Sequence, residues 1–111
     1  MDSSDLLQGI RLFNQGDFFE AHEVLEDVWR AAPEPDKKFL QGLIQVAVAL
    51  HHHSKGNLVG ARSLLERAAR NLAFYPESYG GVNVAKLLCE LSGWQAYLKD
   101  GASRVPPLPQ I

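Results

Sequence analysis

Two stretches of the chain, forty positions apart, carry the same pattern: FNQGDFFEAHEVLE at residues 13–26 and HSKGNLVGARSLLE at residues 53–66. In each copy a glycine, Gly16 or Gly56, ends one predicted helix, and the next residue, Asp17 or Asn57, is a good N-cap for the following helix. A small alanine follows five positions after each glycine, where two helices can approach closely. The repeat therefore predicts two helical hairpins similar to tetratricopeptide hairpins, although that repeat has a period of about 34 residues.

Helical spacing of apolar residues extends over most of the chain, and the period-two alternation typical of strands is absent. Because two hairpins are too few for an open repeat array, we expect an all-α, compact bundle of about five helices with tetratricopeptide-like hairpins. The expected helices cover about Ser4–Gln15, Asp17–Ala31 and Asp36–Lys55, then a helix that carries Leu58 to Leu72, and one that follows a loop at Tyr75–Gly81 and ends near Asp100.

The third of these helices is the expected centre of the bundle. It is apolar on most sides from Phe39 to Leu50, which is typical of a helix covered by others. Pro33 and Pro35 separate it from the helix before, and Asp36 is its expected N-cap.

The length of the chain allows one domain. With 111 residues there is room for a single core, which we place at residues 1–100, followed by a proline-rich tail at residues 101–111. The tail contains Pro106-Pro-Leu-Pro109, a P-x-x-P pattern that is more often a plain extended segment than a recognition motif.

Charge and targeting signals exclude several classes of protein. The chain has 11 Lys and Arg against 13 Asp and Glu, so it lacks a basic excess and we expect no nucleic-acid partner. The most apolar stretch, Leu43–Leu50, is far shorter than the roughly 18 to 20 residues of a membrane span. The first residues of the sequence lack the basic start and apolar run typical of a signal peptide. Cys89 is the single cysteine, so no intrachain disulfide forms. We expect a cytoplasmic protein without a membrane partner.

A second pattern, H-x-x-x-E-x-x-W, places three functional side chains on one side of the predicted second helix. At about 100° per residue, Glu26 lies about 40° from His22, and Trp29 lies about 20° from His22 on the other side. A histidine and a glutamate one turn apart can bind one metal ion through nitrogen and oxygen, or form a hydrogen bond to each other.

The predicted third helix carries a matching polar stripe. Gln41, Gln45 and His52 fall within about 40° of one another by the same arithmetic, and Gln45 interrupts the apolar run. Because an unpaired buried polar group costs roughly 1–3 kcal/mol, we expect the two stripes to face each other. This arrangement predicts a buried polar site between the second and third helices.

These residues resemble the signature of the bacterial and archaeal domain of unknown function 309 family. The resemblance lies in GDFFEAHEVLEDVW at residues 16–29 and QGLIQVAVALHHHSKGN at residues 41–57, and it extends over about residues 5–75. It implies an all-helical fold and a metal-binding role for the motif formed by His22, Glu26 and Trp29. It implies no reaction, because the family has no established activity.

Three roles stay open for His22 and Glu26: a buried structural pair, a metal site, and a small-molecule or acid–base site. In the metal interpretation, His22, Glu26 and His52 hold a divalent ion, while Trp29, Gln41 and Gln45 shape the site. The alternative is a helical-hairpin interaction module in which the polar stripe is purely structural. A homodimer and a protein partner are both compatible with the sequence, which does not decide whether the protein is an enzyme.

Overall fold

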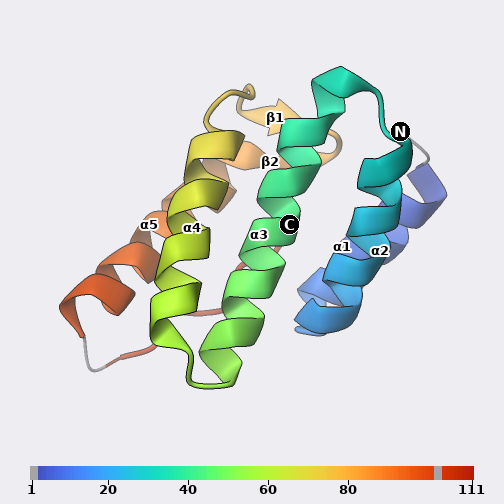
Figure 1. Ribbon diagram of the computed structural model, residues 1–111. Coiled ribbons are helices and arrows are strands. Elements are labelled where there is room, and N and C mark those ends of the chain that lie inside the picture. The colour runs from blue at the N-terminus through green and yellow to red at the C-terminus, as the bar shows by residue number, and fades with distance from the viewer. Residues whose placement is uncertain (1–2, 102–103) are drawn as a thin grey trace.

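Five helices follow one another in an array in which each helix packs mainly on its neighbours in the sequence (Figure 1). The computed structural model describes residues 3–101 and 104–111. The predicted all-α bundle of five helices is confirmed. The elements are α1 (Ser3–Asn14), α2 (Phe18–Ala31), α3 (Glu34–Ser54), α4 (Leu58–Leu72), β1 (Ser78–Tyr79), β2 (Val82–Asn83) and α5 (Val84–Asp100).

Helix α3 lies in the middle of the array, between α2 and α4, as its sequence predicts (Figure 1). Its apolar side chains from Phe39 to Leu50 form much of the core. Helix α4 approaches it so closely that a Cβ atom added at Gly42 would lie 2.8 Å from Cγ of Leu72. Among the described residues, no helix is long and apolar enough to cross a membrane.

The repeated sequence forms the same turn twice. Gly16 and Gly56 have φ angles of 84° and 81°, in the left-handed region that favours glycine. The backbone N–H groups of Asp17 and Asn57 donate to carbonyl oxygens five residues earlier, at 3.0 and 2.9 Å, which satisfies carbonyls at the helix ends. The alanine five positions after each glycine is buried in both hairpins. The sequence repeat is therefore a structural repeat of one helix-turn-helix unit.

The expected cap of α3 was wrong, whereas Asp17 does occupy the N-cap position of α2. Helix α3 begins at Glu34, two residues before Asp36, because the fixed φ of proline suits the first turn of a helix and Pro35 lies there. The side chain of Asp36 instead accepts a hydrogen bond from Tyr79. Asp17 precedes α2 but its side chain makes no capping hydrogen bond, whereas Asn57 accepts one from the N–H of Gly60 at 3.0 Å.

The loop before α5 contains a short antiparallel pair of strands, β1 and β2, which the sequence analysis did not predict. Each strand has only two residues, too few for alternation to be recognised. The local signal was Gly80-Gly81, since both glycines have positive φ, of 57° and 79°, as a tight hairpin turn requires.

Tyrosines connect this hairpin to the start of α3. The hydroxyl of Tyr75 donates to the carbonyl of Pro35 at 2.7 Å, and the hydroxyl of Tyr79 donates to the Asp36 carboxylate. Both rings also contact Phe39, with centroids 5.5 and 5.0 Å apart. The hydrogen bond to Asp36, together with burial and the negative charge, raises the pKa of Tyr79 from its usual 10.0 to about 12.

The raised pKa predicts a loss of stability at high pH. The protonated phenol is favoured in the folded state, so its contribution is complete below pH 10 and is lost as the pH rises from 10.0 to about 12. We expect Tyr79→Phe to be less stable than the unmodified chain below pH 10, and the difference to shrink toward pH 12. Urea unfolding of both proteins across this range measures it, and a difference independent of pH would contradict the assignment.

Candidate functional site

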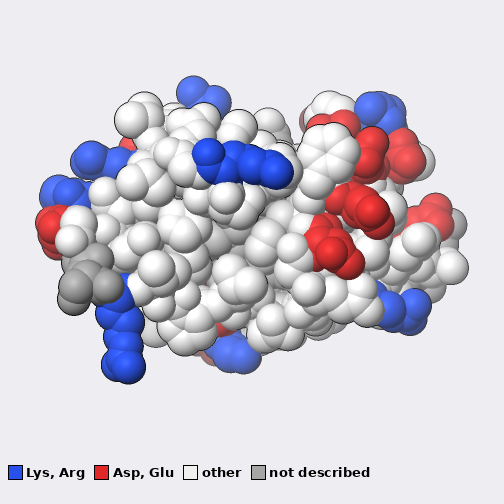
Figure 2. Space-filling view, turned by 90° about the horizontal axis from the view of Figure 1, so that it is seen from below, with Lys and Arg blue, Asp and Glu red and all other residues white. Residues whose placement is uncertain are grey.

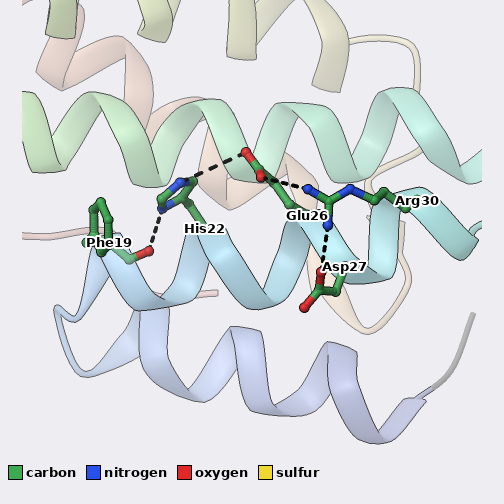
Figure 3. A network of polar contacts seen from close by, with 5 residues as sticks. All are labelled: Phe19, His22, Glu26, Asp27 and Arg30. Atoms are coloured by element: carbon green, nitrogen blue, oxygen red, sulfur yellow. Dashed lines mark hydrogen bonds and ion pairs between the residues drawn. The ribbon is translucent and has the colours of Figure 1, made fainter.

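His22 and Glu26 begin a network of polar side chains along α2 (Figure 3). Nδ1 of His22 contacts the backbone carbonyl of Phe19, and because a carbonyl only accepts, Nδ1 carries the proton. In the neutral ring, Nε2 is then an acceptor, and it lies 3.9 Å from the Oε1 atom of Glu26. These two acceptor atoms face each other, so the space between them can hold a proton, a water molecule or a cation.

This polar network continues from Glu26 to Arg30 and Asp27. Nη2 of Arg30 lies 3.5 Å from Oε2 of Glu26, and Nη1 donates to Oδ1 of Asp27 at 2.7 Å. The side chains of His22 and Glu26 are 19% and 41% exposed, and no polar or charged residue that the structure describes is buried. The expectation of a buried pair was wrong, because the polar face of α2 turns toward solvent at the edge of α3.

A pocket of about 300 Å³ opens beside this polar network, between α2 and α3. Four of the side chains predicted for the site line it, together with Arg30 and Ile44, which the sequence analysis did not select. Arg30 lies four residues after Glu26, and this i,i+4 spacing is the signal that would have found it. The complete lining is Glu26, Trp29, Arg30, Gln41, Ile44 and Gln45.

Trp29 forms one wall of the pocket and has an unpaired donor. Its indole Nε1–H is buried and has no hydrogen-bond partner. Lys37 also contacts this residue: its ammonium group is 4.5 Å from the ring centroid and donates to the Trp29 carbonyl at 2.8 Å. The ring therefore borders the pocket and also contacts a cation.

The two glutamines of α3 differ in their surroundings. Gln41 is exposed at the pocket, whereas the Oε1 atom of Gln45 accepts a hydrogen bond of 2.9 Å from Asn71 on α4. Gln45 thus connects the pocket to α4 through a contact that spans 26 positions in the sequence. Its amide group keeps further donors and acceptors for a ligand.

His52 lies near the end of α3 and is not among the residues that line the pocket. Its ring neighbours that of His51, with centroids 6.4 Å apart. His51 is the member of the histidine run that reaches α2, because its ring packs on Phe19, which also contacts His22. Within residues 3–101 and 104–111, no group of three His, Cys, Asp or Glu side chains is arranged to hold a metal ion.

Charge is unevenly distributed around the site. Figure 2 shows acidic side chains gathered at the end of the molecule formed by α1 and α2, while the centre of the same face carries few charges. Glu20, Glu23 and Asp27 are exposed on α2. None of these three acids lines the pocket, whose charged neighbours have both signs: Glu26 and Arg30 line it, and Lys37 lies against Trp29.

A family model described as "Domain of unknown function (DUF309)" matches residues 6–64, just over half of the chain. The chain belongs to this family. The matched region contains α2 and α3, and with them every residue predicted for the site.

Two relatives show the same domain within longer proteins. An uncharacterized protein of Aquifex aeolicus (strain VF5) is 34% identical over 102 residues, which cover 89% of this chain and 28% of the relative. The uncharacterized protein YpuF of Bacillus subtilis (strain 168) is 44% identical over 57 residues, or 50% of this chain and 33% of that protein. The chain therefore spans about a third or less of the length of these relatives.

The exposure of Glu26 predicts a small effect on stability. We expect Glu26→Gln to change the free energy of unfolding by less than about 1 kcal/mol, because exposed ion pairs contribute little. Leu25→Ala, at the neighbouring position with 0% exposure, should cost about 2–5 kcal/mol. Urea unfolding of the three proteins measures both values. A loss above about 2 kcal/mol in Glu26→Gln would show that the pair is structural after all.

Proposed function

We propose that this domain binds a small organic molecule in the pocket between α2 and α3. The observation that carries the proposal is that Trp29 lines the pocket and that its buried indole N–H has no partner. An unsatisfied buried donor costs roughly 1–3 kcal/mol, which an acceptor on a ligand that reaches this N–H would recover. The volume of about 300 Å³ lies at the lower end of the range of small-molecule sites.

The lining suggests the class of ligand. Trp29 and Ile44 offer an apolar surface, while Glu26 and Arg30 place opposite charges beside it. The guanidinium group suits a carboxylate, and the Glu26 carboxylate suits an ammonium group. An amino-acid-like or dipeptide-like zwitterion fits this combination best.

A divalent metal ion is the second candidate, and the orientation of His22 favours it. Histidines that bind metal usually donate their other ring N–H to a carbonyl or carboxylate, as Nδ1 does to Phe19. Nε2 of His22 and the Glu26 carboxylate would then provide one nitrogen and one oxygen ligand, which suits Zn²⁺ or Mn²⁺ with water completing the shell.

The cytoplasmic location, the homodimer and the protein partner stay predictions.

The pocket proposal is tested by NMR with a panel of free amino acids and dipeptides. We expect at least one member to shift the indole signal of Trp29 and the side-chain amide signals of Gln41 and Gln45. Ile44→Phe, which fills the pocket, should weaken that binding about tenfold or more, equivalent to about 1.4 kcal/mol.

Val59→Phe is the matched control, because it adds the same ring on α4 at a side chain that is 83% exposed and outside this pocket. It should leave the affinity unchanged. A panel in which no compound shifts these signals, or equal losses in both variants, would contradict the proposal.

The metal candidate predicts about one transition-metal ion per chain. Elemental analysis of untagged protein and thermal shifts with zinc and manganese salts should show binding that is lost in His22→Ala and in Glu26→Gln. Glu23→Gln is the control, since Glu23 is an exposed acid on the same helix. Binding that survives in His22→Ala, or absence of any ion and any thermal shift, would remove the metal candidate.

A further inference from the structure

Residues 104–111 connect the two outer helices of the array. They contain no helix or strand, and in Figure 1 they run from the α5 end of the molecule toward α1. The indole N–H of Trp94, on α5, donates to the carbonyl of Pro107 at 2.9 Å. At the other end, the N–H of Ile111 donates to Oδ1 of Asn14, the last residue of α1, at 2.7 Å.

Apolar contacts accompany these hydrogen bonds. Pro109 is buried, and Ile111 packs against the core. Leu108 passes so close to the turn after α1 that a Cβ atom added at Gly16 would be 3.9 Å from its Cδ1 atom. Trp94 is only 1% exposed. The 104–111 segment is therefore anchored at Trp94 and Asn14, and the surface that it covers between these two residues is called the groove below.

The chemistry of this groove suits an extended proline-containing chain. Proline has no N–H group and a fixed φ, so such a chain presents carbonyl acceptors and apolar rings at little conformational cost. Aromatic grooves recognise these segments in several interaction domains. Here a buried tryptophan donates to a carbonyl of the proline run, and a buried proline follows two residues later.

The segment is held less firmly than the helices. Among the described residues, none of the backbone–backbone hydrogen bonds outside the helices and strands involves residues 104–111. Its hydrogen bonds to the helices use the side chains of Trp94, Asn14 and Gln110. Val105 and Leu108 are about half exposed, at 51% and 48%. Release of the segment therefore breaks few hydrogen bonds, and the main contacts that it removes are the apolar ones of Pro109 and Ile111.

We propose that the groove between Trp94 and Asn14 is a docking site for an extended proline-containing peptide of a partner protein. The 104–111 segment is its exchangeable occupant within the chain. Because a short tether gives an effective concentration in the millimolar range, the segment competes strongly with an external peptide. Docking of a partner is thus weak until the segment is released.

The test uses the full chain and a synthetic peptide with the sequence RVPPLPQI of residues 104–111, followed through the NMR signal of the Trp94 indole N–H. Pro109→Ser alters the occupant and leaves the groove intact, so we expect the peptide to bind this variant about tenfold more tightly than the unmodified chain. Asn14→Ala also loosens the segment but removes a groove contact, so it should bind the peptide about tenfold more weakly than Pro109→Ser does. A scrambled peptide is the control.

Several results would overturn the proposal. One is a folded Pro109→Ser chain whose Trp94 signal does not respond to the peptide; another is equal binding to the Asn14→Ala chain. Should Pro109→Ser fail to fold, Gln110→Ala takes its place. Hydrogen exchange of the unmodified chain gives an independent measurement, because the Trp94 indole N–H should exchange faster than the core amides of α3. Equal rates would make the segment a fixed part of the fold.

A second copy of this chain is the competing occupant. A concentration-dependent dimer of the unmodified chain, seen by light scattering and abolished in Asn14→Ala, would place the segment of another copy in the groove. That result would overturn the assignment to a partner protein. A monomer at all concentrations, together with binding of the peptide to Pro109→Ser, supports the assignment.

Discussion

The apolar surface of α3 has to be covered on several sides, and the rest of the structure depends on this requirement. Burying such a surface is the main favourable contribution to folding, so α2 and α4 pack along it on either side. The cover is incomplete between α2 and α3, where Gln41, Ile44 and Gln45 line the pocket. The candidate site therefore lies where the apolar face of the central helix gives way to polar residues.

The repeated turn explains how the cover is built. Two hairpins with the same left-handed glycine place α1 beside α2 and α4 beside α3, each with an alanine where the helices meet. Gly42 then leaves room for the Leu72 side chain of α4, because a Cβ atom at this position would lie 2.8 Å from Cγ of Leu72. The second helix of the first hairpin carries the polar motif, so the arrangement that completes the core also places His22 and Glu26 at the edge of α3.

Local signals predicted the helices, the repeated turns and most of the lining of the pocket. They did not predict the exposure of Glu26, or that His51 is the histidine whose ring contacts α2, where His52 was expected. A helical wheel gives the angle of a residue on its own helix and not the rotation of one helix against another. Contacts between distant positions, such as Gln45 with Asn71, were also beyond local patterns. The short hairpin at Gly80-Gly81 is different, because two adjacent glycines are a local signal for a tight turn.

The pocket and the groove under residues 104–111 are made from different residues. The pocket uses α2 and the middle of α3, whereas the segment contacts Asn14 at the end of α1 and Trp94 on α5. A ligand in the pocket therefore cannot displace the segment by direct contact. Coupling between the two would require the α1–α2 hairpin to shift as a unit against α3, because Gly9 on α1 packs directly on Leu25 of α2. Since close-packed helices resist such sliding, the two surfaces should be occupied independently.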